Sequence, residues 1–278
     1  MADAANDDQF DASESISNLA IRSMMCVPLL DKDNEPIGII NVDTMNPVTQ
    51  FTNEDLDLLM TVAGQAALTY ENARLMKVFL EKQKQDGEMS IAQGVQQALL
   101  PDSTPELAGW GFGAWSEPAD ETGGDIYDFA HIPGEPDVFM LLADATGHGV
   151  GPAISAAQVR AMARMALRTG TDLRGLLANL NAQLHEDLPS GRFITLWAAR
   201  LDHHTGALRT LSAGQAPLVR YHAAEDRFEV FDASVVPLGI ISDLGDVQAD
   251  THALGAADFY AVFSDGIYEA RSPEGEQF

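Results

Sequence analysis

The alternation of apolar and polar residues near the start of the chain predicts a β-hairpin. Apolar strands are expected over residues 23–30 and 37–43, on either side of a polar turn at 31–36. Two strands alone do not form a stable sheet, so other structure is expected to cover this hairpin.

A long helix is predicted from residue 52 to about residue 85. Thr52 has Asp55 three residues further on, which is the arrangement of a helix N-cap. Apolar side chains then recur at four- and three-residue intervals on one face: Leu56, Met60, Ala63, Ala67 and Tyr70. This face could pack on the hairpin or form a coiled contact with a second chain. Asp86-Gly87 is expected to interrupt the helix, and a second apolar helix is expected to end at Pro101.

Three acidic turns, each beside an apolar strand, stand out in the rest of the chain. In LLADATGHGVGPAISAA (141–157) an apolar run leads to Asp144, followed by a Gly-rich turn and a helix that Pro152 opens. Asp125 follows two glycines, and Asp265 precedes another. Mg²⁺ and Mn²⁺ prefer carboxylate and backbone oxygens, and glycine lets the backbone approach the ion. One such turn is ordinary; three together indicate a metal site.

The length and the net charge of the chain narrow the classes of protein to which it could belong. The 278 residues suggest about two domains. Sixteen basic residues against 42 acidic ones give a formal net charge of −26, which argues against a nucleic-acid partner. The single cysteine, Cys26, excludes a disulfide within the chain; it is expected to be a small apolar strand residue rather than a nucleophile. No apolar run approaches ~18 residues, so a soluble cytoplasmic protein is expected, without membrane association.

The first quarter of the chain resembles the C-terminal half of a GAF domain. The matching segments are IRSMMCVPL (21–29), PIGIINVD (36–43), FTNEDL (51–56) and AGQAA (63–67). GAF domains are often small-molecule sensors that pair through terminal helices. The resemblance implies a partial GAF-like sensor domain at 1–75 and linker and entry helices at 76–100.

The remainder resembles the metal-dependent serine/threonine phosphatases of the protein phosphatase 2C-like (PPM) superfamily, in its SpoIIE/RsbU-type branch. The segments that carry the resemblance, in order, are QGVQQALLP (93–101), GGDIYD (123–128), ADATGHG (143–149), SAGQAP (212–217), PLG (237–239) and FSDGIYEA (263–270). The resemblance implies an α+β fold at 101–278, in which two antiparallel sheets lie between helices.

The same resemblance implies a dinuclear Mg²⁺ or Mn²⁺ site. Asp144 would be shared by both ions, and the carbonyl of Ala145 would complete part of one shell. Asp125 would hold a metal-bound water, and Asp265 would serve the second ion. Two ions about 3.5–4 Å apart would activate a water and neutralise the phosphoryl oxygens, so that no protein nucleophile is required.

Three further residues are candidates for the site. Asp128 lies three residues beyond Asp125, which puts it on the opposite face of a regular strand, so a structural role competes with a metal-binding one. His148 could transfer a proton to the leaving hydroxyl, or it could merely lie in the turn. Gly266 follows Asp265 directly.

Two other groups are expected to have ordinary roles. His203 and His204 lie between apolar runs, in a predicted hairpin turn, and adjacent strand residues point apart, so a shared metal is not expected there. Arg160, Arg164 and Arg168 recur every four residues on a helix; a solvated face is expected, with phosphoprotein docking as the alternative.

The leading hypothesis is a protein serine/threonine phosphatase, regulated by an N-terminal GAF sensor, that acts on an anti-sigma-factor antagonist-like partner and forms a homodimer through the linker helix. The resemblance would continue past Phe278 through another helix and a strand with one more metal-binding Asp, so a fragment is expected, with an incomplete second metal shell and an exposed sheet edge. A weak or inactive dimeric module that holds a phosphoprotein is the alternative. In a third interpretation the acidic turns bind no metal and serve only as turns between strands.

Overall fold

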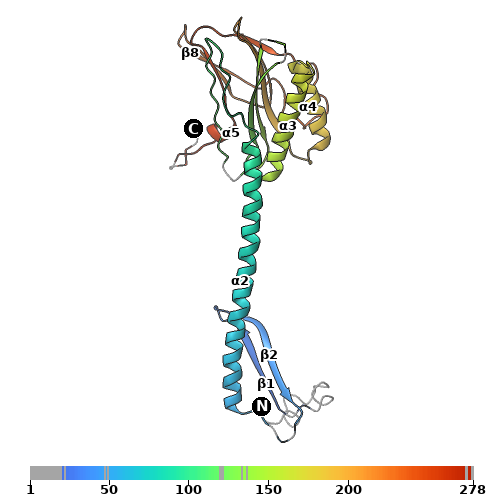
Figure 1. The fold of residues 1–278 in the computed structure, drawn as a ribbon, viewed down its shortest axis with the longest axis vertical. Coiled ribbons are helices and arrows are strands. Elements are labelled where there is room, and N and C mark those ends of the chain that lie inside the picture. The colour runs from blue at the N-terminus through green and yellow to red at the C-terminus, as the bar shows by residue number, and fades with distance from the viewer. Residues whose placement is uncertain are drawn as a thin grey trace. The chain divides into compact units, whose positions relative to one another are not determined.

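The computed structural model describes residues 21, 23–46, 48, 50–118, 122–132, 134–135, 137–272 and 275–276. The chain divides into two compact units, Met1–Asp86 and Gly87–Phe278 (Figure 1). The division falls inside the region expected to be a linker, 76–100. The part of the expected GAF segment that precedes Ile21 lies outside the described residues.

The first unit contains the predicted hairpin. Strand β1 (Ser23–Leu30) pairs antiparallel with β2 (Pro36–Thr44). The carboxylate of Asp31 organises the turn between them, because its Oδ1 accepts hydrogen bonds from the backbone N–H groups of Asp33 and Glu35 at 2.9 and 2.8 Å. The hairpin and its turn are therefore confirmed.

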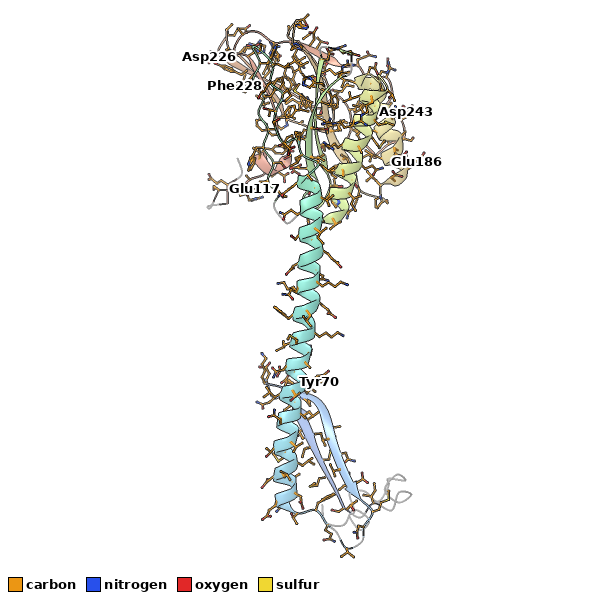
Figure 2. The ribbon with its side chains drawn as sticks, viewed as in Figure 1. Tyr70, Glu117, Glu186, Asp226, Phe228 and Asp243 are labelled. Carbon is orange, nitrogen blue, oxygen red and sulfur yellow. The ribbon has the colours of Figure 1, made fainter. Side chains whose placement is uncertain are left out.

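The long helix α2 (Asn53–Gln97) begins with the predicted cap. Thr52 N–H donates to Asp55 Oδ2 at 2.8 Å, and Asp55 N–H donates back to Thr52 Oγ1 at 3.3 Å. Ala63 and Ala67 on the predicted apolar face are buried, whereas Tyr70 projects outward and is 58% exposed (Figure 2).

The expected break at Asp86-Gly87 is wrong, because α2 continues through both residues to Gln97. A glycine inside a helix costs only about 1 kcal/mol relative to alanine, which the many neighbouring helix-forming residues outweigh. The helix ends where predicted, in a tight turn before Pro101 in which Leu100 N–H donates to the carbonyl of Gln97.

The second unit is built on two antiparallel sheets. The larger has the order β3-β4-β5-β6-β9, and the smaller has the order β10-β7-β8. The strands are β3 (Asp125–His131), β4 (Asp137–Ala145), β5 (Ile194–Asp202), β6 (Ala207–Ala213), β7 (Leu218–His222), β8 (Arg227–Phe231), β9 (Asp250–Ala253) and β10 (Phe259–Val262). The turn between β5 and β6 is the predicted hairpin turn with His203 and His204.

Helices α3 (Val150–Arg168) and α4 (Leu173–Asp187) pack on one face of the five-stranded sheet, while α5 (Asp265–Tyr268) is a single turn. One buried core lies between these helices and the sheet, and it includes Ile126, Leu141 and Leu180. A second core lies between the two sheets, around Trp197 and Leu218. The α+β class with antiparallel sheets is confirmed.

Within the described part of the chain, no helix has the length and apolar composition needed to cross a bilayer.

Candidate functional site

The pairing of β3 with β4 brings two of the predicted aspartates together. Asp125, the first residue of β3, is the register partner of Asp144, near the end of β4. Along β3 the buried positions are Ile126, Asp128 and Ala130, so Asp125 lies on the other face of the strand. Side chains of register partners in an antiparallel pair lie on the same face and close together.

Asp265 reaches the same place from the end of the smaller sheet. It begins α5, and the residue before it, Ser264, donates a hydrogen bond from its Oγ to Asp125 Oδ2 at 2.8 Å. Asp125, Asp144 and Asp265 all line one cavity of about 290 Å³. His148 and Gly266, two of the further candidates, line it as well.

The pKa values of two of these carboxylates, Asp125 and Asp144, are raised at this site. Burial raises the pKa of Asp144 to about 7, and the charges of Asp125 and Asp265 add to this effect. Burial also raises the pKa of Asp125; the hydrogen bond from Ser264 opposes this rise, and the charge of Asp265 reinforces it. Asp125 Oδ1 is buried without a hydrogen-bond partner among the described residues. None of the described residues that line the cavity is a lysine or an arginine, so no cationic side chain in the lining offsets the negative charge of these carboxylates.

The backbone around the cavity fits a hard cation. A Cβ on Gly124 would lie 2.1 Å from the carbonyl oxygen of Ala145 and 2.9 Å from Asp144 Oδ1, so only glycine allows this approach. The available donors are carboxylate and carbonyl oxygens, which suit Mg²⁺ and Mn²⁺ rather than softer metals.

The donors do not form a closed cage. Among the described residues, no three His, Cys, Asp or Glu side chains are grouped so that they could hold a metal ion. Like charges repel one another, so three carboxylates have no reason to converge without a cation. The residues therefore fit a metal by position and chemistry rather than by a preformed coordination shell.

The loop after β4 is fixed from outside the cavity. Thr146 Oγ1 donates to the carbonyl of Phe193 and accepts from its N–H, each at 3.1 Å. Gly147 and Gly149 have φ of 96° and 87°, the left-handed region that favours glycine. This conformation presents His148 between them to the cavity.

Asp128 lies outside the cavity, on the face of β3 that α3 covers. Its side chain is 2% exposed and accepts bonds from Arg164 Nε and Nη2 at 2.5 and 2.6 Å, while Arg160 Nε lies 3.2 Å from its Oδ2. The opposite-face prediction is confirmed, and the contacts are structural. The expected solvated face is wrong for Arg160 and Arg164, which turn toward the sheet; Arg168 is exposed.

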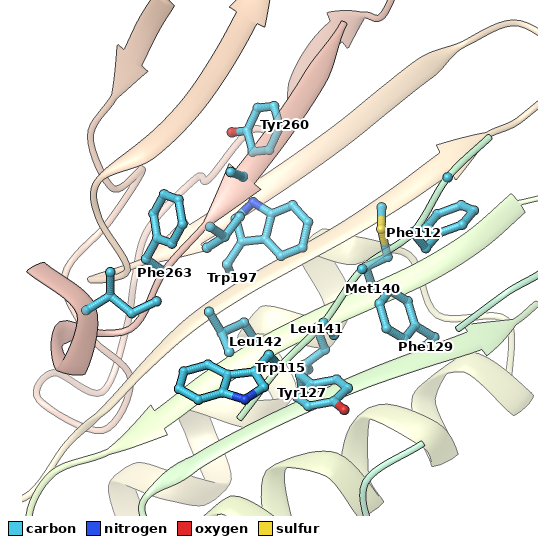
Figure 3. Close-up of a pocket in the computed structure, with 16 residues that line it drawn as sticks. Phe112, Trp115, Tyr127, Phe129, Met140, Leu141, Leu142, Trp197, Tyr260 and Phe263 are labelled. Carbon is cyan, nitrogen blue, oxygen red and sulfur yellow. The ribbon is translucent and has the colours of Figure 1, made fainter. Parts of the chain in front are cut away.

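A larger cavity of about 490 Å³ lies between the sheets. Aromatic side chains that include Tyr127, Trp197 and Tyr260 line it (Figure 3). None of the described residues that line it carries a carboxylate, so the chemistry predicted from the sequence belongs to the smaller cavity.

Two polar residues of the site have roles that sequence reasoning missed. Ser264 and Gln96 both fall inside segments that carry the family resemblance, but their partners are 139 and 27 residues away in the chain. No local pattern indicates a contact over such a separation.

Comparison with known proteins gives the family. The family model for stage II sporulation protein E (SpoIIE) matches residues 134–278, more than half of the chain. The chain belongs to the SpoIIE family. The GAF domain model matches residues 1–70. The SpoIIE match includes Asp144 and Asp265, whereas Asp125 precedes it.

Three relatives are informative. The chain is 28% identical to phosphoserine phosphatase RsbU of Bacillus subtilis, over 79% of this chain and 64% of RsbU. It is 22% identical to protein IcfG of Synechocystis, over 91% of this chain and 44% of IcfG. The SiaA-PP2C domain of Pseudomonas aeruginosa has a similar fold, with a TM-score of 0.60 at 20% identity, over 71% of this chain and 78% of that one. The chain thus spans less than two thirds of either curated relative.

Proposed function

We propose that this chain is a metal-dependent protein serine/threonine phosphatase. The observation that carries the proposal is that Asp125, Asp144 and Asp265, from three separate segments, line one cavity in which the pKa of Asp144 is raised to about 7. Membership of the SpoIIE family and the similarity to RsbU, a phosphoserine phosphatase by name, support the reaction class.

In this proposal the cavity holds two Mg²⁺ or Mn²⁺ ions. Asp144 would be shared between them, Asp125 and Asp265 would each serve one side, and the Ala145 carbonyl would add an oxygen. Gly266, the residue after Asp265, also lines the cavity. Bound ions would supply an activated water and would neutralise the phosphoryl oxygens of the substrate. In this proposal His148, which lines the cavity, would transfer a proton to the departing hydroxyl.

We further propose that the substrate is a phosphorylated partner protein resembling an anti-sigma-factor antagonist, and that the GAF-like segment regulates its hydrolysis. The similarity to RsbU and the GAF match at residues 1–70 support both points. The formal charge of −26 disfavours nucleic acid as a partner. The single cysteine, Cys26, suits a cytoplasmic protein because no internal disulfide is possible.

A homodimer through α2 is part of the proposal. The helix exposes large apolar side chains along its length, among them Leu68, Leu75 and Phe79. A second copy of the helix would remove these side chains from water. A dimeric mass by sedimentation at micromolar concentration is expected, and a monomeric mass would contradict this part of the proposal.

A second candidate function is phosphoprotein binding without turnover. The observation in its favour is that no three potential ligand side chains are grouped for a metal among the described residues. Such a module would hold a phosphoprotein without hydrolysing it.

Hydrolysis assays distinguish the two functions. We expect Mn²⁺-dependent release of phosphate from p-nitrophenyl phosphate and from a phosphoserine protein. Asp144→Asn should abolish this activity, whereas Asp232→Asn, which changes an exposed carboxylate of a loop, should retain it. Equal activity in Asp144→Asn and the wild type would contradict the phosphatase proposal. Absence of turnover, with retained binding of the phosphoprotein, would favour the module.

A further inference from the structure

The last turn of α2 makes a specific contact with the segment that leads into Asp125. The side-chain amide of Gln96 donates from Nε2 to the carbonyl of Gly123 at 2.7 Å, and Gly123 N–H donates to Gln96 Oε1 at 3.2 Å. Nε2 also lies 3.5 Å from the carbonyl oxygen of Asp125. Gln96 is 8% exposed and lines the cavity of the three aspartates.

This pair of hydrogen bonds has the form of a β-ladder contact. A side-chain amide carries one carbonyl and one N–H₂ group, so it can satisfy both backbone groups of one residue as a neighbouring strand would. Gly123 precedes β3, which begins only at Asp125. Gln96 therefore makes with Gly123 the pair of hydrogen bonds that a neighbouring strand would make inside the sheet.

The segment needs such a contact because two consecutive glycines precede Asp125. Glycine has the largest backbone freedom of any residue, so Gly123-Gly124 does little by itself to fix the direction of the chain. Gly124 cannot be exchanged for a stiffer residue, since its Cβ would collide with the Ala145 carbonyl. The segment is instead held from two sides, by Gln96 at Gly123 and by Ala145 N–H, which donates to the Gly124 carbonyl at 3.1 Å.

We propose that Gln96 is a positioning residue, which holds Gly123 and Gly124 so that the carboxylate of Asp125 is in place to bind the metal. The inference rests on the proposed function of the site. Gln96 does not touch the ion in this role; it acts through the backbone. Removal of an outer-shell partner of a metal ligand typically weakens metal binding about 10- to 100-fold.

The test is the affinity for Mn²⁺, measured by electron paramagnetic resonance of the free ion and independent of turnover. Gln96→Met keeps the length of the side chain and removes both hydrogen bonds; Gln96→Glu keeps the acceptor for Gly123 N–H and loses the donor. We expect about tenfold weaker binding for Gln96→Met and a smaller loss for Gln96→Glu. Gln85→Met, at an exposed position of the same helix, should bind as the wild type does.

A second readout separates positioning from general support of the fold. In the metal-free protein, amide hydrogen exchange at Gly123 should be about tenfold faster in Gln96→Met, with the melting temperature close to that of the wild type. Wild-type Mn²⁺ affinity in a folded Gln96→Met or Gln96→Glu would overturn the inference and leave the proposed function standing. Absence of Mn²⁺ binding by the wild type would instead refute the proposed site itself.

Discussion

Asp125 and Asp144 are register partners on adjacent antiparallel strands. Two carboxylates directly opposite each other in a sheet destabilise it, and here burial adds to the cost by raising the pKa of both side chains. Nothing in the folding of the sheet requires this pair. A bound cation would remove the repulsion, and this relationship therefore motivates the metal site.

Gly124→Ala should disrupt the site through the backbone. The added Cβ would lie 2.1 Å from the Ala145 carbonyl oxygen, so β3 must move away from the end of β4. We expect a loss of stability of about 1–3 kcal/mol by urea unfolding and strongly weakened Mn²⁺ binding. Gly94→Ala is the matched control, since a Cβ there meets nothing within 4 Å. Full Mn²⁺ affinity in Gly124→Ala would show that this close approach is not needed.

Asp128→Asn should destabilise the protein without affecting the metal. The Asp128 carboxylate is 2% exposed and binds both Arg160 and Arg164. Loss of its charge leaves two arginines without their partner, which should cost about 2–4 kcal/mol, given that Arg164 is partly exposed. Equilibrium unfolding in urea measures this loss. Unchanged stability combined with lost Mn²⁺ binding would make Asp128 a ligand instead.

Asp258 should contribute stability that depends on pH. Its carboxylate, 7% exposed, accepts hydrogen bonds from Arg220 and from the N–H groups of Gly255 and Ala223, which hold its pKa well below the usual value. A depressed pKa gives stability that is present above the unfolded value of about 3.9 and is lost as the pH falls through the lower folded value. Asp258→Asn should therefore melt below the wild type at pH 7.

The difference in melting temperature between the wild type and Asp258→Asn should shrink from about pH 4 downward, because the carboxylate of the unfolded wild-type chain then takes up a proton while that of the folded protein is still ionised. A difference that is the same at pH 7 and pH 2.5 would show that the ionised carboxylate is not the source of the stability.

Gly87→Ala should stabilise α2. Gly87 lies inside the helix, and a Cβ there meets nothing within 4 Å. The gain expected for an exposed helix position is about 0.5–1 kcal/mol, measured as a higher helix melting temperature by circular dichroism. A loss of stability would indicate that the helix bends or opens at Asp86-Gly87.

Local patterns in the sequence predicted the elements that depend on local interactions. The hairpin turn at Asp31, the cap at Thr52 and the stop before Pro101 each involve residues within a few positions of one another. The strand ends at Asp125 and Asp144 were predictable for the same reason. The break expected at Gly87 does not form, because the neighbouring helix-forming residues outweigh the small cost of one glycine in a helix.

Contacts between segments that lie far apart in the chain could not be predicted from the sequence alone. Arg160 and Arg164 have the spacing of a solvated helix face, but both turn toward the sheet to contact Asp128, which lies more than 30 residues earlier in the chain. Likewise, the glutamine at 96 is one of several in its helix, and only the fold pairs it with Gly123. In each case a polar partner from another element decides the orientation.

The binding of Mn²⁺ tests the central claim most directly. Titration of the metal-free protein, followed by electron paramagnetic resonance, should show a saturable site in the wild type and in Asp232→Asn. Asp144→Asn should bind at least about tenfold more weakly, because it removes the carboxylate proposed to be shared by both ions. Equal affinity in Asp144→Asn and the wild type, with both proteins folded, would contradict the assignment of this cavity as a metal site.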